Sequence, residues 1–172
     1  MATTINTLAD FYYYPLENDP KNDAFTQKEN GKWVSLSSEE FVNKAKQLSK
    51  GILKSGIKKG DRVAVISNNR TEWHLIDLAV QQIGVVNVPI YPNITEDDYT
   101  YILNDCGAKM VFVSDEDILG KIKNIQPNTP SVEKILTFNK INSQPNYSSL
   151  VEELDASDEK LFIDFRNDIN AA

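Results

Sequence analysis

His74 is the only histidine in the chain, so any acid–base chemistry based on an imidazole depends on it. An imidazole exchanges protons near neutral pH. Asp77 and Gln81 follow at successive spacings of three and four residues, which would place the three polar side chains on one face of a helix. No Gly-x-Ser-x-Gly motif accompanies His74, and one histidine cannot supply an ordinary zinc site. We therefore expect a solvated or interface histidine rather than a catalytic one.

Two short motifs have some features of phosphate- or ion-binding loops. Residues 51–58, Gly-Ile-Leu-Lys-Ser-Gly-Ile-Lys, have the glycine spacing of a phosphate loop but lack a lysine directly after Gly56. They also lie at the end of a predicted helix, where Gly56 is better explained as the helix cap. Residues 115–120, Asp-Glu-Asp-Ile-Leu-Gly, look like part of a calcium loop, but Leu119 and Gln126 occupy positions that need oxygen ligands. We expect these acids in the first turn of a helix, where the dipole favours them.

Two further features concern one cysteine and a run of tyrosines. Cys106 directly precedes Gly107 and has no basic neighbour in sequence to activate its thiol, so we expect a packing residue at a helix end. Tyr12-Tyr13-Tyr14 forms either a docking patch for a partner or a packing surface against the next element, since tyrosine suits half-buried surfaces of both kinds.

The elements that would position these residues are clearest in the middle of the chain. Two apolar runs, residues 61–67 and 85–91, flank a helical segment over residues 70–83. A strand, a helix and a strand joined this tightly predict a parallel βαβ unit with a right-handed connection. Parallel sheets bind ligands at the carboxyl ends of their strands. The corresponding residues are Ser67-Asn68-Asn69 and Tyr91-Pro92-Asn93, and neither group carries a catalytic signature.

The helical segment over residues 70–83 carries two sets of apolar side chains. We expect the first set to be core and to cover the sheet: Trp73, Ile76, Val80 and Ile83. The second set adds apolar surface beyond this stripe: Leu75, Leu78 and Ala79. A helix that is apolar around most of its circumference is normally buried on more than one side. We therefore expect an uncovered apolar patch and self-association of the chain.

The rest of the chain continues the alternation of strands and helices. A β-hairpin with its turn at Asn30-Gly31 precedes the parallel unit. Two capping boxes mark helix starts: Ser37 with Glu40, and Thr95 with Asp98. The other expected elements are a short amphipathic start over residues 7–14 broken by Pro15, strands over 109–113 and 133–138, a helix over 115–125 and a weaker helix over 147–154. This order indicates an α/β fold with a largely parallel sheet, crossover helices and a preceding β-hairpin.

Composition narrows the classes of function. A chain of 172 residues is one domain or an incomplete part of a larger one, and is long enough for a hydrophobic core. Its 18 basic and 25 acidic residues give a net charge of −7, which argues against nucleic acid as a partner. No apolar run reaches the ~18 residues of a membrane span, and the start lacks the features of a signal peptide. A single cysteine excludes an internal disulfide. We expect a cytoplasmic protein with at most peripheral membrane contact.

Five segments, taken in order, carry a family resemblance. They are Trp33 to Phe41, Gly56 to Ala64, Ser67 to Trp73, Gly84 to Pro92 and Tyr101 to Lys109. Together they resemble the N-terminal portion of a long-chain fatty-acid CoA ligase, a member of the adenylate-forming, AMP-binding enzyme superfamily. The tyrosine-rich start and Tyr91-Pro92-Asn93-Ile94-Thr95 favour the long-chain branch.

The resemblance implies a two-step reaction in an intact enzyme. A fatty-acid carboxylate would attack the α-phosphate of ATP, and the thiol of CoA would then displace AMP from the acyl-adenylate. Family members are several times longer and carry a Ser/Thr/Gly-rich loop with a lysine for the ATP phosphates. They also carry later motifs for adenine, ribose and magnesium, and a mobile C-terminal domain with a catalytic lysine. None of these motifs occurs in this sequence.

We therefore expect residues 1–172 to form the N-terminal part of an AMP-binding domain that stops before the phosphate loop, with residues 1–24 as an N-terminal arm. No residue is assigned a catalytic, cofactor-binding or metal-binding role. ATP, magnesium and CoA belong to the intact enzyme, and the isolated piece is expected to be inactive. Its partners would be the rest of its own enzyme and, in that enzyme, the fatty acid, while homo-oligomer formation is left open.

Two other classes of function compete with this interpretation. One is a stand-alone α/β binding or signalling module, such as a receiver-like domain. A receiver needs clustered acids after its first strand, whereas Ser67-Asn68-Asn69 carries no charge. The other is a small enzyme that uses His74, which ranks lowest because the residue has no catalytic partner motif.

Overall fold

A computed structural model describes residues 5–170, so residues 1–4 of the predicted N-terminal arm lie outside it. The strands are β1 (Phe25–Glu29), β2 (Lys32–Leu36), β3 (Arg62–Ile66), β4 (Val86–Ile90), β5 (Met110–Val113) and β6 (Lys134–Thr137). The helices are α1 (Asp10–Asn18), α2 (Ser38–Lys54), α3 (Thr71–Gln81), α4 (Glu96–Cys106), α5 (Glu116–Ile125) and α6 (Ala156–Asn170), with 3-10 turns η1 (Gln126–Asn128) and η2 (Tyr147–Leu150).

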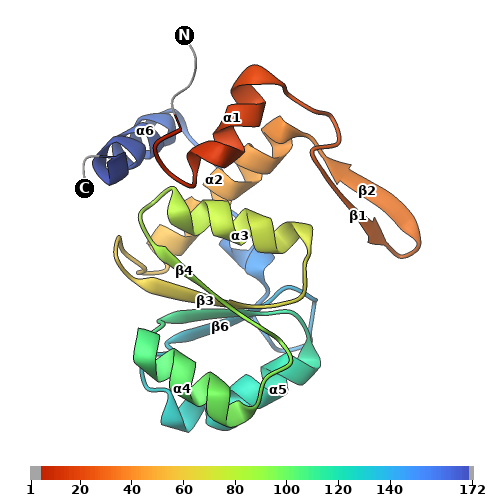
Figure 1. Cartoon of the computed structure of the whole chain (residues 1–172), viewed down its shortest axis with the longest axis vertical. Helices are drawn as coiled ribbons and strands as arrows, with labels where there is room; N and C mark the ends of the chain where they lie inside the picture. Colours follow the sequence, from red (N-terminus) through yellow and green to blue (C-terminus); the bar gives the residue numbers. More distant parts are fainter. Residues whose placement is uncertain (1–4, 171–172) are drawn as a thin grey trace.

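The centre of the molecule is a parallel sheet with the strand order β4-β3-β5-β6. Helices α2 and α3 lie on one face of this sheet and α4 and α5 on the other, while the β1–β2 hairpin stands away from the body (Figure 1). Side chains of β3 alternate between the two faces: Val63 and Val65 contact the first layer, and Ala64 and Ile66 the second. The predicted α/β fold with a parallel sheet and a preceding hairpin is confirmed.

The local signals predicted from the sequence produce the expected turns and caps. Asn30 and Gly31 have φ angles of 49° and 82°, as a tight hairpin turn requires. The Thr95 hydroxyl accepts a hydrogen bond from the backbone N–H of Asp98, 3.2 Å away, and completes a capping box. Gly107 ends α4 in the left-handed region, with φ 61°. Each of these elements therefore begins or ends through contacts within a few residues.

The prediction for the sheet-facing stripe of α3 is correct for three residues and wrong for Trp73. Ile76, Val80 and Ile83 are fully buried, whereas Trp73 is only partly buried. The reason is that α3 lies over β4, which is the edge strand, so no further strand covers the outer side of Trp73.

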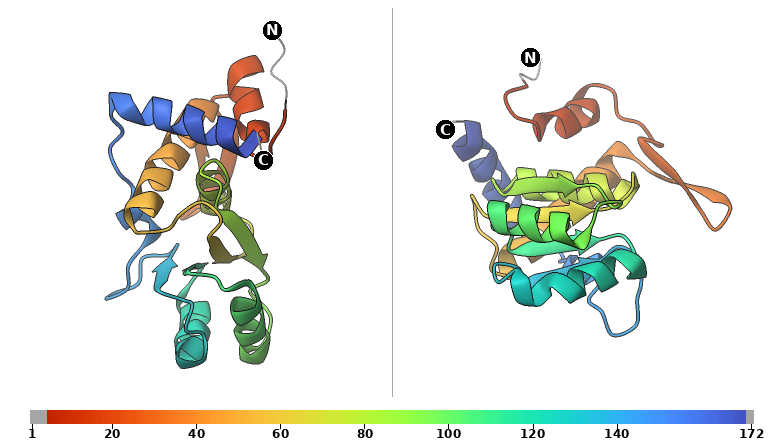
Figure 2. Two further views of the ribbon diagram at one scale, coloured as in Figure 1. Left: turned by 90° about the vertical axis from the view of Figure 1, so that its left-hand side faces the viewer. Right: turned by 60° about the horizontal axis from the view of Figure 1, so that its bottom comes forward.

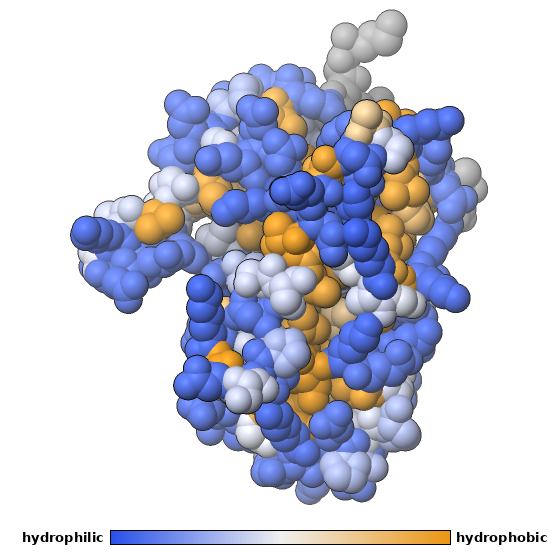
Figure 3. Space-filling view, turned by 180° about the vertical axis from the view of Figure 1, so that it is seen from behind, coloured by the Kyte–Doolittle hydropathy of each residue, from blue (hydrophilic) through white to orange (hydrophobic). Residues whose placement is uncertain are grey.

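The expected uncovered patch on α3 is also wrong. Leu75, Leu78 and Ala79 are buried because α2 packs over them, and Ser49 of α2 donates a hydrogen bond to the carbonyl of Ala79 at 2.7 Å. Large apolar side chains are exposed elsewhere, at Leu8, Phe11, Trp33, Val86, Tyr91 and Tyr101. Seen from behind, the surface is mostly hydrophilic with a band of apolar side chains down its middle (Figure 3).

Two expectations need correction towards the two ends of the chain, and one helix there was not expected at all. Helix α1 is not broken by Pro15 but runs through it to Asn18, and the Pro15 carbonyl accepts a bond from the N–H of Asp19. The weaker helix expected over residues 147–154 is only the short turn η2. Helix α6 was not predicted, and it lies across α2 close to α1 (Figure 2).

Ion pairs attach the C-terminal segment to α2. Lys46, Lys50 and Lys54 lie one turn apart and contact Glu159, Asp158 and Glu152 at 2.7–2.8 Å. Phe162 of α6 is buried in the core that α2 and α3 share. Arg166 pairs with the buried Asp10 of α1 at 2.7 Å. The end of the chain therefore closes one side of the fold. No helix within residues 5–170 is long and apolar enough to cross a membrane.

Candidate functional site at the carboxyl edge of the sheet

The strand order creates one topological switch point. The chain passes from β3 to β4 on one side and then returns to β5 on the other side of β3. Ligands of open α/β sheets bind outside the carboxyl ends of the strands at such a point. The predicted residues Ser67-Asn68-Asn69 follow β3 and lie there, next to Ser114-Asp115 after β5. Tyr91-Pro92-Asn93 follows the edge strand β4, on the opposite side of β3 from the switch point.

Arg70 organises this edge. Its Nε and Nη2 atoms each lie 3.0 Å from an oxygen of Glu72, which forms a bidentate ion pair. Its Nη1 donates to Asn139 Oδ1 at 3.1 Å, and its guanidinium lies 5.1 Å from the centre of the Phe138 ring. Arg70 therefore connects the loop after β3 to the loop after β6, and its charge is already neutralised by Glu72.

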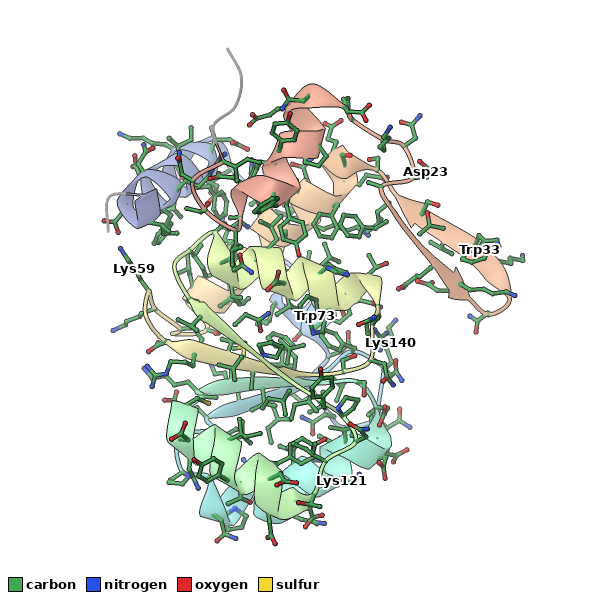
Figure 4. All side chains as sticks on the ribbon, in the orientation of Figure 1. Asp23, Trp33, Lys59, Trp73, Lys121 and Lys140 are labelled. Carbon is green, nitrogen blue, oxygen red and sulfur yellow. The ribbon has the colours of Figure 1, made fainter. Side chains whose placement is uncertain are left out.

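The hairpin approaches the same edge. Gln27 of β1 accepts a hydrogen bond from the backbone N–H of Thr71 at 2.8 Å and so satisfies one donor in the first turn of α3. Between the hairpin and the sheet edge lies a polar depression of about 1000 Å³. Its lining includes Lys28, Glu29, Asn69, Arg70 and Lys140. Lys140 stands at this edge, and Trp33 lies on the hairpin (Figure 4).

The carboxylates at this edge are ionised at neutral pH. Burial opposes the charge of Glu72, but hydrogen bonds from Arg70 outweigh it and hold the pKa of this carboxyl below its usual value. Burial also opposes the charge of Asp115, whose pKa is nevertheless lowered by the Ser114 hydroxyl and the N–H of Ile118. Burial and the charge of Glu72 raise the pKa of the Tyr147 hydroxyl, which therefore stays protonated. The polar groups at this edge thus include the side-chain amides of Asn69 and Asn139 and the ammonium groups of Lys28 and Lys140.

His74 lies away from this edge, inside an aromatic cluster. Its ring centre is 5.1 Å from that of Trp73 and 5.5 Å from that of Phe25, and its Nδ1 lies 3.4 Å from the Tyr12 hydroxyl. Burial lowers the pKa of the imidazole, only partly offset by the charge of Asp77, so the ring is neutral at pH 7. His74 is therefore an interface residue between α1, the hairpin and α3, as one of the two expected placements had it.

The tyrosine run divides between packing and exposure. Tyr12 stacks on Phe41 at 5.5 Å, and its hydroxyl donates to Asp77. Tyr13 is buried and donates to Gln82 at 2.6 Å. Tyr14 is the exposed member. Packing is therefore the main role of the run, and only part of it is directed towards the hairpin.

The two loop-like motifs have structural roles. Gly56 follows the end of α2 with φ 98°, as expected for a helix cap. Gly51, in contrast, lies against the backbone of Leu150, and a Cβ atom there would approach the Leu150 carbonyl oxygen to 1.8 Å. Asp115 caps α5 by accepting from the N–H of Ile118 at 3.1 Å. Cys106 is the last residue of α4 and is partly buried, as expected for a packing residue.

The described side chains can be compared with what the phosphates of ATP and a magnesium ion require. Within residues 5–170, no three Asp, Glu, His or Cys side chains come together to hold a metal. Helix N-termini could bind phosphate, but side chains of the chain already fill four of them. Ser37 and Thr95 cap α2 and α4, and Asp115 caps α5. At the start of α3, the side chain of Gln27 accepts the hydrogen bond of the Thr71 N–H.

Sequence reasoning missed the two groups that shape the carboxyl edge. Arg70 and Asn139 were not selected as site residues, although each follows a predicted strand closely. Their positions directly after β3 and β6 were the available signal. Their contact was not available, because it joins residues 69 positions apart.

Comparison with known proteins agrees with the fold and the resemblance. The long-chain-fatty-acid–CoA ligase FadD15 of Mycobacterium bovis is 26% identical over 140 residues, which cover 81% of this chain and 23% of that protein. The long-chain-fatty-acid–CoA ligase ACSBG1 of Rattus norvegicus is 25% identical over 132 residues, which cover 77% of this chain and 18% of that protein. The chain thus spans less than a quarter of the length of these relatives.

Two solved structures share the fold. The anthranilate CoA ligase AuaEII, in complex with anthranoyl-AMP, gives a TM-score of 0.72 at 20% identity, covering 84% of this chain and 27% of AuaEII. MbtA of Mycobacterium smegmatis gives a TM-score of 0.72 at 18% identity, covering 87% of this chain and 27% of MbtA. The family model of AMP-binding enzymes matches residues 15–165. The chain therefore belongs to the family of AMP-binding enzymes, the adenylate-forming ligases.

Proposed function

We propose that this chain supplies the N-terminal part of the adenylate-forming domain of a cytoplasmic long-chain fatty-acid–CoA ligase. The intact enzyme would activate a fatty acid with ATP to the acyl-adenylate and pass the acyl group to CoA. The observation that carries the proposal is the family match over residues 15–165, in a chain that spans 23% of a long-chain ligase. At identities of 25–26%, the relatives support membership of the family more strongly than a preference for long acyl chains.

The role of this part in the proposed enzyme is structural. It would provide a parallel sheet whose carboxyl edge, fixed by Arg70, forms one wall for a ligand held mainly by later segments. The sequence contains no recognisable phosphate-binding loop, and residues 5–170 bring no metal-binding group of side chains together, so we expect no turnover from the 172-residue chain. Its partners would be the remainder of the same enzyme and, in that enzyme, the fatty acid, ATP, magnesium and CoA.

The first experiment uses the chain as it stands. Calorimetry with ATP and magnesium should give no micromolar binding, and pyrophosphate release with palmitate should stay at background. Micromolar binding or turnover would contradict a scaffold role.

The second experiment concerns the reading frame after Ala172. A Gly/Ser/Thr-rich loop with a lysine should follow, and the extended protein should form palmitoyl-CoA in an ATP-dependent reaction. Replacement of that lysine by alanine provides the matched control and should abolish adenylate formation. A stop codon directly after Ala172 would favour a stand-alone α/β binding module instead.

A further inference from the structure

A groove runs along the open edge of the sheet, between strand β4 and helix α3. Its cavity has a volume of about 620 Å³, within the range of small-molecule sites. Trp73, Val86 and Pro89 provide apolar walls. Val86 is 50% exposed, so the groove opens to the surface. Residues 6–9 and Ile169 of α6 also line it, and the polar part of the lining includes Asp77, Gln81 and Asn87.

Asp77 is a buried carboxylate with neutral partners. The residue is 8% exposed. Its Oδ1 accepts from the amides of Gln81 at 2.7 Å and Asn87 at 2.6 Å, and its Oδ2 accepts from the Tyr12 hydroxyl at 2.8 Å. Across residues 5–170, no Lys, Arg or His side chain lies within ion-pair distance of it. Buried charges are ordinarily paired with an opposite charge, so Asp77 leaves an uncompensated negative charge beside the groove.

The same hydrogen bonds leave two acceptors without donors. Gln81 and Asn87 both turn their amide nitrogens towards Asp77, since a flipped amide would place its oxygen against the carboxylate. Gln81 Oε1 and Asn87 Oδ1 are buried and lack any hydrogen-bond partner among the described residues. Both residues line the groove. An apolar wall that includes an aromatic ring therefore lies beside one carboxylate and two buried, unpaired carbonyl oxygens.

We propose that this groove binds a small organic monocation, namely a primary ammonium group on an apolar stem. The ammonium would compensate the charge of Asp77, and a turn of the Gln81 and Asn87 side chains would let their unpaired oxygens accept its remaining N–H groups. The stem would lie along Val86 and Pro89, with Trp73 adding attraction between its ring and the cation. Asp77 would repel a carboxylate such as a fatty acid, so this site is distinct from an acyl site and does not depend on the proposed function.

The direct test uses n-hexylamine as the probe, with n-hexanol and hexanoate as neutral and anionic controls. Trp33 is 72% exposed on the hairpin, so a Trp33→Phe background leaves Trp73 as the only tryptophan and as the reporter of binding. We expect hexylamine to change the fluorescence of Trp73 saturably, with a dissociation constant at least ten-fold lower than that of hexanol. Hexanoate should cause no saturable change. Equal binding of hexanol, or no saturable response to hexylamine, would overturn the proposal.

Two variants test the assignment of the site. Asp77→Asn keeps the shape of the side chain and removes its charge, and should weaken the binding of hexylamine at least ten-fold. Because Asp77 also holds three neighbours, a second variant changes only the surface: Val86→Lys places a tethered ammonium at the groove and should weaken hexylamine similarly with an unchanged thermal midpoint. Val34→Lys is the control, since Val34 is 41% exposed on the hairpin. Unaltered affinity in both groove variants, or tighter binding of a lysine-containing tripeptide than of hexylamine, would overturn a small-molecule site.

Discussion

The ammonium of Lys50 lies 2.8 Å from Oδ2 of Asp158, and this pair joins the middle of α2 to the start of α6. The two side chains are only 16% and 7% exposed, so the pair is shielded from solvent more than an ordinary surface ion pair. Lys50 also contacts Asp155 at 3.0 Å. The pair of Lys50 with Asp158 is therefore the most shielded of the charged contacts that attach α6 to α2.

Replacement of Lys50 by methionine should loosen α6 without unfolding the sheet, because it removes the charges that hold Asp155 and Asp158. Hydrogen exchange over residues 156–170 should accelerate in Lys50→Met, while amides of β3 and β5 keep their protection. Lys160→Met is the control, since Lys160 has no partner among the described residues. Equal exchange of α6 in the two variants would show that the remaining contacts, Phe162 and the ion pairs of Glu159 and Arg166, hold the helix without Lys50.

Gly51→Ala should destabilise the protein by about 3 kcal/mol or more. The added Cβ would lie 1.8 Å from the Leu150 carbonyl oxygen, so the backbone of η2 must move. Gly120→Ala in α5 is the matched change: a Cβ there has no neighbour within 4 Å, and the gain in helix propensity should stabilise by about 0.5–1 kcal/mol. The midpoints of urea unfolding give the change in stability of each variant. Equal effects would mean that α2 and Leu150 are not in close contact in solution.

The two tryptophans should respond differently to truncation. Trp73→Ala should cost about 2 kcal/mol, less than the about 3–5 kcal/mol of a fully buried aromatic residue, because one side of the ring faces the groove. Trp33→Ala should stay within about 0.5 kcal/mol, since this side chain is 72% exposed. Guanidinium melts followed by circular dichroism provide the comparison. A larger loss from Trp33 would show that the hairpin packs more closely in solution than this structure shows.

The stability of the protein should decrease as the pH falls from about 7 to 5, because of His74. Burial lowers the pKa of the folded imidazole, so the unfolded chain binds a proton first, near its ordinary pKa of about 6.5. The contribution is complete above that value and is lost as the pH falls through the folded pKa. His74→Gln should remove this slope, and His74 is the only histidine. Thermal melts at several pH values measure the effect. The same dependence of the thermal midpoint on pH in both proteins would contradict the attribution of this dependence to His74.

Local signals explain why much of the fold could be predicted. The hairpin turn at Asn30-Gly31 and the capping box at Thr95 depend on contacts within a few residues, and the strands on runs of apolar residues. Helix α6 depends on partners far away, such as Lys46 for Glu159, 113 residues apart. Its apolar residues follow no clear stripe, and only Phe162 is fully buried. The sequence alone could not show that a mostly exposed segment would dock as a helix.

The candidate sites show the same division. The position of Ser67-Asn68-Asn69 after β3 could be predicted, since it requires only a strand and its end. Locating the switch point required the strand order, because the point lies between β3 and β5 and not between β3 and β4. The groove at Asp77 required knowing that β4 is an edge strand and that Gln81 and Asn87 share one carboxylate oxygen. Tertiary neighbours rather than local pattern decide both.

The ion pair between Asp10 and Arg166 has a consequence for synthesis on the ribosome. The two residues are 156 positions apart, so at about 5–20 residues per second α1 exists for roughly 8–30 s before its partner is made. Strands β3 and β4 lie close in sequence and can pair long before that time. We expect α1 to stay protease-sensitive on nascent chains that stop before Arg166 and to become protected only on longer ones. Helix α1 is thus among the last elements within residues 5–170 to reach its native place.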